Sequence, residues 1–255
     1  MLNTARNPWI VQPRPNPRAP LRLFCFPYAG GGASVFRKWP EYLPSSVEVY
    51  AIQLPGREGR LVEEPFKSLS QLIEVLGPVL LSSLDRPFVF FGHSLGASVG
   101  FELARWLRRH YQMMPAILFV AGRRAPHLLE TDPPIHDLPD KEFLEELRTL
   151  KGTPPEVLTN PELMQLIRPM LSADFAMSHN YEYVPEPPLE CPIIAFGGLE
   201  DKDVTKDYLD GWREHTSASF TLRMLPGDHF FLHTSQPTML HMLAKDLLPV
   251  MGALV

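Results

Sequence analysis

Runs of consecutive apolar residues recur along the chain, and most lack the alternation of apolar and polar positions that marks a half-exposed strand. Strands that are apolar on both faces are typical of a parallel sheet with helices on both sides. The pattern therefore predicts a mostly parallel central sheet. The runs, of which only the last alternates clearly, cover residues 21–26, 47–54, 87–91, 116–121, 192–196 and 220–225.

Segments with helical periodicity lie between these runs, as the crossovers of a parallel sheet require. Residues 68–83 begin with Ser68 and Gln71 in capping-box spacing and continue as an apolar stripe. Residues 95–111 begin with small residues and end in arginines, which suit the negative end of a helix dipole. We expect an α/β fold in which strands and helices alternate.

About 70 residues separate the fourth and fifth runs, far more than a crossover helix needs. We expect helices over residues 140–150 and 160–177, the second with Asn160 as N-cap and a kink or restart at Pro169. Residues from about 125 to 188 are therefore treated as a helical insertion. The insertion belongs to one domain over residues 21–255, which a proline-rich arm, residues 1–20, precedes.

Charge and composition exclude several classes of protein. With 24 basic and 29 acidic side chains the formal net charge is −5, so a nucleic-acid partner is not expected. No apolar stretch is long enough for a signal peptide or a membrane span, which predicts a soluble cytoplasmic protein. Cys25 and Cys191 have no zinc-ligand spacing, so we expect two buried thiols and no metal.

The stretch FVFFGHSLGASVG at residues 88–100 ends an apolar run with Gly-x-Ser-x-Gly and leads into a predicted helix. A nucleophile elbow occurs in this context, because its serine occupies a sharp turn in which neighbouring side chains would collide with the backbone. The five-residue pattern alone is weak, and a packing turn of small residues is the plainer alternative. Its position between strand and helix favours Ser94 as the nucleophile of an α/β-hydrolase fold.

A serine nucleophile needs a histidine base that a carboxylate orients, and in this fold the acid precedes the histidine along the chain. Asp201, in GGLEDKDV after the fifth run, is the candidate acid, and its acidic neighbours are expected to form a solvated loop. Asp132 is the runner-up. Of nine histidines, His229 directly follows the last run and is the candidate base, whereas His93 flanks the nucleophile.

A second glycine-rich turn, FCFPYAGGGAS at residues 24–34, follows the first run. Three glycines alone often mean only a flexible loop. After the first strand, however, they suit the loop whose backbone N–H joins that of the residue after the nucleophile in an oxyanion hole. The two donors would be the N–H groups of Ala29 and Leu95.

Six motifs occur in one order and together resemble the bacterial type II thioesterases, the discrete hydrolases of polyketide synthases and nonribosomal peptide synthetases. The resemblance runs from about residue 21 to the C-terminus. The motifs are PYAGGGAS (27–34), LPGREGR (54–60), FGHSLGA (91–97), AGRRAP (121–126), GGLEDKDV (197–204) and PGDHFFL (226–232).

The resemblance implies a triad of Ser94, Asp201 and His229, an oxyanion hole of Ala29 and Leu95 N–H groups, and a mobile lid formed by the insertion. It also implies no metal or cofactor. An acid after the penultimate strand is the type II arrangement, whereas integrated polyketide thioesterases resemble one another in placing it one strand earlier. We expect no fused carrier domain, in agreement with a discrete, editing enzyme.

The implied substrate is an acyl group on the phosphopantetheine arm of an acyl or peptidyl carrier protein, with acyl-CoA as a surrogate and no membrane partner. Arg123 and Arg124 follow a strand; they either contact the carrier or a phosphate, or form internal salt bridges. The insertion's methionines suit either a pliable acyl pocket or an ordinary core. They are Met164, Met170 and Met177.

Two other functions fit the same residues. A general carboxylic-ester hydrolase would use the same triad, because the triad does not encode the leaving group. A catalytically silent carrier-binding adaptor would keep the fold without needing Ser94 to react.

Overall fold

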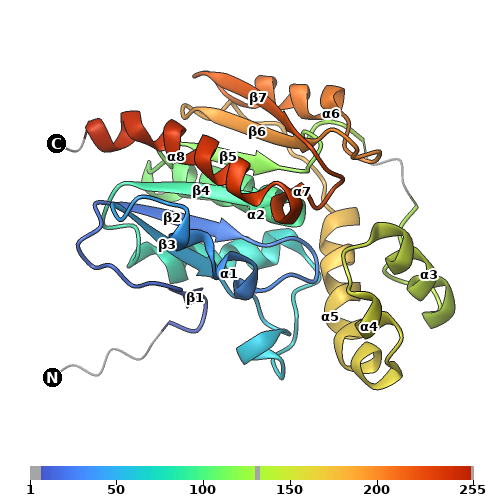
Figure 1. The fold of residues 1–255 in the computed structure, drawn as a ribbon. Coiled ribbons are helices and arrows are strands. Elements are labelled where there is room, and N and C mark those ends of the chain that lie inside the picture. The colour runs from blue at the N-terminus through green and yellow to red at the C-terminus, as the bar shows by residue number, and fades with distance from the viewer. Residues whose placement is uncertain (1–6, 130–132, 254–255) are drawn as a thin grey trace, which may run out of the picture.

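The computed structural model describes residues 7–129 and 133–253, which contain a seven-stranded sheet of order β1-β3-β2-β4-β5-β6-β7 (Figure 1). β1 pairs antiparallel with β3, and every other neighbouring pair is parallel. The mostly parallel sheet and its six predicted strands are confirmed. The strands are β1 (Ile10–Val11), β2 (Leu21–Phe26), β3 (Val47–Ile52), β4 (Phe88–His93), β5 (Leu118–Ala121), β6 (Ile193–Gly198) and β7 (Phe220–Leu225).

The helices expected over residues 68–83 and 95–111 are confirmed as α1 and α2, and the Ser68 hydroxyl accepts a hydrogen bond from the Gln71 N–H at the start of α1. No helix within the described ranges is long and apolar enough to cross a membrane. The helices are α1 (Leu69–Leu81), α2 (Leu95–Tyr111), α3 (Asp140–Leu150), α4 (Pro155–Leu158), α5 (Pro161–His179), α6 (Lys206–Asp210), α7 (Phe231–Thr234) and α8 (Gln236–Gly252).

β1 was not expected from the sequence, because a strand of two residues leaves no periodicity to detect. Ile10 pairs with Ile52, and Val11 pairs with Ala51. The preceding Trp9 is buried, and the guanidinium of Arg60 lies 4.0 Å from its ring centroid. From residue 7 onward, part of the proline-rich arm therefore packs on the domain.

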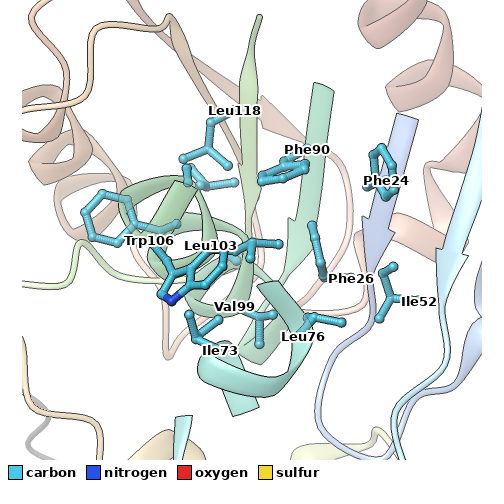
Figure 2. Packing of buried hydrophobic residues seen from close by; sticks show 14 of the residues in the cluster. Phe24, Phe26, Ile52, Ile73, Leu76, Phe90, Val99, Leu103, Trp106 and Leu118 are labelled. Carbon is cyan, nitrogen blue, oxygen red and sulfur yellow. The ribbon is translucent and has the colours of Figure 1, made fainter. Parts of the chain in front are cut away.

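Each face of the sheet is covered by its own helices, so alternate residues of one strand belong to different cores. Phe24 and Phe26 of β2 pack with α1 and α2 (Figure 2). Leu23 and Cys25 of the same strand pack with α8 on the other face. Burial on both faces explains why most successive positions of these runs are apolar, and each fully buried large side chain contributes about 1.5–3 kcal/mol. The expected buried thiols are confirmed, since Cys25 and Cys191 are both buried and free.

The insertion gathers α3, α4 and α5 at one end of the sheet (Figure 1). These helices share a small core that includes Phe143, Leu147 and Leu171. α5 runs through Pro169 without interruption, so the restart expected there is wrong. Burial of the residues that follow, among them Met170 and Leu171, offsets the backbone hydrogen bond that a proline removes.

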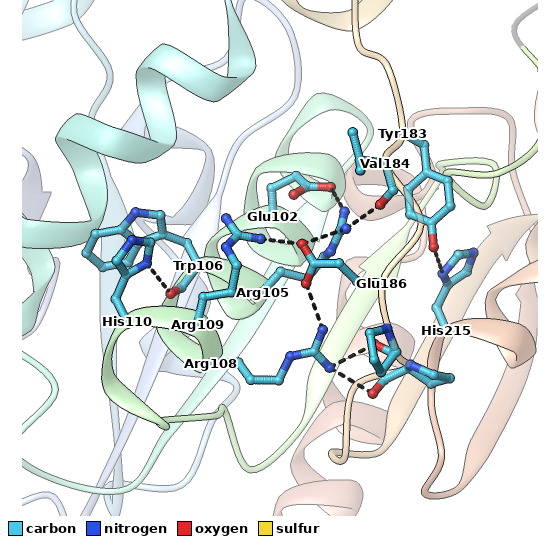
Figure 3. A network of polar contacts seen from close by, with 12 residues as sticks. Glu102, Arg105, Trp106, Arg108, Arg109, His110, Tyr183, Val184, Glu186 and His215 are labelled. Carbon is cyan, nitrogen blue, oxygen red and sulfur yellow. Dashed lines mark hydrogen bonds and ion pairs between the residues drawn. The ribbon is translucent and has the colours of Figure 1, made fainter.

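The chain returns from the insertion to β6 along α2, where ion pairs hold it (Figure 3). Glu186 pairs with Arg105, Arg108 and Arg109 at N···O distances of 2.9, 2.9 and 2.5 Å. Arg108 also donates to the carbonyl oxygens of Pro187 and Pro188. The arginines expected to suit the α2 dipole thus also anchor the end of the insertion.

Candidate active site

Ser94 lies in the turn between β4 and α2, at the carboxyl end of its strand. Its φ of 53° and ψ of −118° are a conformation that a non-glycine residue adopts only when the surrounding structure enforces it. The Ser94 N–H donates to the carbonyl oxygen of Ala121 over 2.8 Å, which ties the turn to the end of β5. The turn has the strained geometry that a nucleophile elbow requires.

Gly92 and Gly96 make this turn possible because no side chain fits at either position. A Cβ on Gly92 would overlap the carbonyl oxygen of Gly96, and a Cβ on Gly96 would overlap the carbonyl oxygen of Phe26. Gly100, one helical turn further along α2, differs, since its Cβ would meet its nearest neighbour, Phe26 Cδ2, at an ordinary 3.4 Å.

Gly96→Ala is therefore expected to lower the free energy of unfolding by about 3 kcal/mol or more, because β2 and α2 must separate to accept the methyl group. Gly100→Ala is the matched control. It should leave stability unchanged or raise it by up to about 1 kcal/mol, since alanine favours the helix. Urea unfolding of both variants measures the difference, and equal losses would contradict this account of the elbow.

Asp201 lies in the turn after β6, and its side chain is buried. Its Oδ1 accepts from the N–H groups of Asp203 and Val204, each at 3.0 Å. Burial alone would raise its pKa, but the hydrogen bond and charge of His229, with these N–H groups, outweigh burial and lower the pKa below its usual range. The neighbouring Glu200 is exposed, as expected for a solvated acidic loop. The runner-up acid, Asp132, lies outside the described residues.

His229 follows β7, and its Nδ1 lies 2.8 Å from Oδ2 of Asp201. Because an ionised carboxylate only accepts hydrogen bonds, Nδ1 carries the proton and Nε2 is left to accept one. Ser94 and His229 line the same cavity. Among the described residues no hydrogen bond joins them, and in unliganded enzymes this contact commonly tightens only when substrate binds.

Among the described residues, no hydrogen bond or ion pair joins His215 or His233 to Asp201. His215 is buried and hydrogen-bonds His127 over 2.7 Å, and burial lowers the pKa of His215 to about 4. His233 hydrogen-bonds the Tyr28 hydroxyl over 3.0 Å. The position of His229 directly after the last strand therefore identified the histidine that hydrogen-bonds Asp201.

His93, which immediately precedes Ser94, packs beside the candidate base. Its ring is fully buried, with centroid distances of 5.3 Å to His229 and 5.4 Å to Phe231. Burial, followed by the charges of His229 and His233, lowers its pKa well below the usual value, so the ring stays neutral. A neutral His93 therefore packs against the His229 ring without adding a positive charge beside it.

Ala29 and Leu95 are the expected oxyanion donors. Ala29 lines the cavity together with Ser94, and Leu95 is the first residue of α2, whose N–H has no partner within the helix. Within residues 7–129 and 133–253, neither N–H donates to a protein acceptor. Both N–H groups can therefore serve an oxygen atom of a ligand.

The cavity beside Ser94 has a volume of ≈ 350 Å³. Ser94 and His229 line its sheet side, while the insertion supplies an apolar wall. The apolar wall consists of Ile135, Leu147, Leu150, Leu171 and Phe175. None of the three methionines considered from sequence is among the lining residues. Two of them, Met170 and Met177, are buried in hydrophobic cores, so they act as core residues.

Arg123 and Arg124 also line this cavity, and both have internal partners. Arg123 donates to the Ser178 hydroxyl over 2.9 Å. Arg124 is buried, donates to the carbonyl oxygen of Leu129 and lies over the Tyr208 ring. These contacts fit the structural role considered from sequence, and contact with a carrier stays a prediction. In the described part of the chain, no group of three or more His, Cys, Asp or Glu side chains could hold a metal ion.

The mostly parallel sheet, with Ser94 after β4 and the Asp201–His229 pair on the loops after β6 and β7, has the architecture of an α/β-hydrolase. The family model of the thioesterase domain matches residues 21–247, and the chain belongs to the thioesterase family.

Known proteins similar to the chain match it over nearly its whole length. The linear gramicidin dehydrogenase LgrE of Brevibacillus parabrevis is 47% identical over 242 residues, which are 94% of this chain and 92% of LgrE. The gramicidin S biosynthesis protein GrsT of Aneurinibacillus migulanus is 46% identical over 241 residues, 94% of each chain. The type II thioesterase BorB from the borrelidin biosynthetic cluster is 37% identical with a TM-score of 0.88, over 96% of this chain and 100% of BorB.

The name of LgrE describes an oxidoreductase, which the residues of this chain do not match. The sequence contains no Gly-x-Gly-x-x-Gly fingerprint of a dinucleotide site. Its glycines around Ala29 and Ser94 instead form two tight turns beside the cavity.

Proposed function

We propose that this protein is a discrete type II serine thioesterase that removes acyl groups from the phosphopantetheine arm of acyl or peptidyl carrier proteins. The observation that carries the proposal is the Asp201–His229 hydrogen bond, on loops that bring His229 to the cavity of Ser94. Family membership supports a thioester rather than an oxygen ester as the bond cleaved. By clearing stalled or mis-primed carriers, the enzyme would edit a synthase.

Acylation begins when Ser94 Oγ attacks the thioester carbonyl carbon and Nε2 of His229 takes the hydroxyl proton. Asp201 holds the imidazole in the required tautomer and stabilises its positive charge. The Ala29 and Leu95 N–H groups bind the carbonyl oxygen as it becomes negative. The carbon–sulfur bond then breaks, the phosphopantetheine thiolate leaves, and His229 returns the proton to sulfur.

Deacylation repeats these steps with water in place of the serine hydroxyl. His229 takes a proton from the attacking water, the tetrahedral intermediate forms in the same oxyanion hole, and Ser94 leaves with its proton restored. The products are a free carboxylic acid and a carrier with its thiol arm. The steps need no metal or enzyme-bound cofactor, because Ser94 and His229 supply the nucleophile and the proton transfers. The phosphopantetheine is part of the substrate.

The cavity fits the two parts of this substrate. Its apolar wall, contributed by the insertion, suits an acyl chain, while Ala29, Ser94 and His229 face the thioester. The insertion would act as a lid over this cavity, as expected from the family resemblance. The proposed location of this activity is the cytoplasm, as expected from the sequence.

The decisive experiment compares one short acyl group presented as acyl-carrier protein, acyl-CoA and an oxygen ester. We expect kcat/KM for the carrier to exceed that for CoA by about tenfold or more, because the carrier adds its own contacts and steering. Cleavage of the ester but of neither thioester would make the protein an esterase. If a fluorophosphonate did not label Ser94 and no substrate turned over, the silent adaptor would replace the proposal.

The same assay tests Arg123 and Arg124 as carrier contacts. Arg123→Ala and Arg124→Ala should lower kcat/KM several-fold more for acyl-carrier than for a neutral acyl-N-acetylcysteamine thioester, and added salt should reduce the difference. Arg213→Ala, at a mostly exposed arginine, is the control and should affect neither substrate. Equal losses on both substrates would leave the two arginines with a structural role only.

A further inference from the structure

Asp174 is a buried carboxylate on the insertion helix α5 that the proposed mechanism does not use. Its side chain has 0% exposure and lies among apolar neighbours of the same helix. Burying a carboxylate costs several kcal/mol unless charged and hydrogen-bonding partners compensate for the lost water. The groups that bind Asp174 therefore indicate which part of the structure it stabilises.

Arg57, from the LPGREGR motif, forms a two-pronged ion pair with Asp174. The guanidinium reaches Oδ2 over 2.6 Å and Oδ1 over 2.8 Å, and the Arg57 side chain is 4% exposed. Arg57 also donates to the carbonyl oxygens of Gly31 and Pro55. One arginine thus joins α5 to the glycine-rich loop after β2.

Asp174 also binds that loop directly. Its Oδ2 accepts a hydrogen bond from the Gly30 N–H over 2.7 Å. Gly30 has a φ of +82°, and a Cβ there would lie only 2.6 Å from Cδ2 of Leu171, so α5 packs on the loop without a gap. The Gly31 N–H donates to the Tyr28 carbonyl oxygen over 2.9 Å. The resulting turn encloses Ala29, the first expected oxyanion donor.

The segment that carries Arg57 supports the same loop at a second point. Gln53 accepts from the Ala33 N–H over 2.9 Å and donates to the Arg57 carbonyl oxygen over 3.1 Å. Glu58 accepts from both the N–H and the hydroxyl of Ser34. The glycine-rich loop is therefore held on both sides of its turn.

We propose that Asp174 and Arg57 are positioning residues for the oxyanion hole. Their ion pair holds Gly30 and Gly31 so that Ala29 stays at the cavity wall beside Ser94, where its N–H can serve the oxyanion. The inference rests on the proposed function of the Ser94 site. It also changes the role of the insertion, because α5 completes the oxyanion loop in addition to covering the acyl cavity.

Loss of the Asp174–Arg57 ion pair should weaken binding of the transition state more than binding of the substrate. An oxyanion donor acts only if it lies about 2.7–3.1 Å from the oxygen atom that becomes charged, and losing one such donor costs about 10²–10³ in kcat. The neutral thioester in the ground state gains less from the donor, so a displaced loop lowers kcat more than it changes KM. An ion pair that only stabilised the fold would alter neither in the folded enzyme.

The test uses three variants of the full chain. Asp174→Asn keeps the side-chain shape but removes the charge. Arg57→Lys keeps the charge but loses the guanidinium that bonds both carboxylate oxygens. The double variant Arg57→Met with Asp174→Leu replaces the pair by apolar side chains, an exchange that buried ion pairs often tolerate without loss of stability. Asp246→Asn is the control, because its ion pair with Arg223 joins β7 to α8 away from the loop.

For each variant, kcat and KM are measured on an acyl thioester, together with binding of two inhibitors of equal chain length. An acyl trifluoromethyl ketone forms a hemiketal oxyanion on Ser94, whereas a thioether analogue has no carbonyl. We expect Asp174→Asn and the double variant to lose about tenfold or more in kcat and in ketone affinity, with KM and thioether affinity changed less than about twofold. The kcat and the ketone affinity of Arg57→Lys should fall between those of Asp174→Asn and those of the native enzyme.

The inference would be overturned if the folded double variant kept the kcat and the ketone affinity of the native enzyme. It would also be overturned if the variants lost equal affinity for the ketone and for the thioether. Asp246→Asn should lower the melting temperature while leaving the ratio of the two affinities unchanged. If the native protein bound the ketone and cleaved esters but no thioester, the thioesterase proposal would fail while the positioning role could still be measured on the ester.

Discussion

Ser94→Ala should lower kcat for acyl-carrier hydrolysis by about 10⁴-fold or more, because no other hydroxyl can occupy the strained turn between β4 and α2. Ser98→Ala is the matched control. Ser98 lies one helical turn later in α2 and is buried away from the cavity lining, so its replacement should keep activity within about twofold. Single-turnover assays with acyl-carrier protein, with the melting temperature of each variant, measure the effect.

Labelling by a fluorophosphonate gives an independent readout of the same site. The native chain and Ser98→Ala should be labelled, and Ser94→Ala should not. Turnover by Ser94→Ala close to the native rate would move the nucleophile to another residue and remove the basis for the proposed mechanism.

Asp201→Asn should lower kcat on the order of 10⁴-fold while leaving the fold intact. An asparagine can still accept from the Val204 N–H, but its NH₂ group faces Nδ1 of His229 and favours the tautomer with the proton on Nε2. That tautomer cannot take the proton of Ser94. Steady-state kinetics on an acyl thioester, together with the rate of fluorophosphonate labelling, should show parallel losses.

Glu200→Gln is the control for this prediction, since it removes a carboxylate from the neighbouring position. Glu200 is exposed and is expected to leave both rates unchanged. If Glu200→Gln impaired the enzyme and Asp201→Asn did not, the choice of acid within the GGLEDKDV loop would be wrong, although the elbow would stand.

Much of the fold could be predicted because its signals are local. Five strands were visible as mostly apolar runs, because burial on both faces favours apolar side chains at successive positions, and β7 was visible from its alternation. α2 and α3 were predicted with the bounds that the structure has. β1 is too short for any periodicity, and α6 and α7, of five and four residues, were missed for the same reason.

Packing decided the features for which local pattern was a poor guide. Pro169 signalled a break, yet α5 continues through it because the residues that follow are buried. Arg124 could be read equally as a carrier contact or a structural residue; the structure buries it against Tyr208, while contact with a carrier stays a prediction. Neither outcome depends on residues adjacent in the sequence.

The sequence by itself determined the sheet, the elbow and the order of Ser94, Asp201 and His229, because backbone sterics and strand burial act over a few neighbouring residues. The tertiary structure decided which distant groups meet. Asp174 is 117 positions from Arg57, and no spacing rule connects them. They pair because α5 packs on the glycine-rich loop, where a buried carboxylate requires a charged partner.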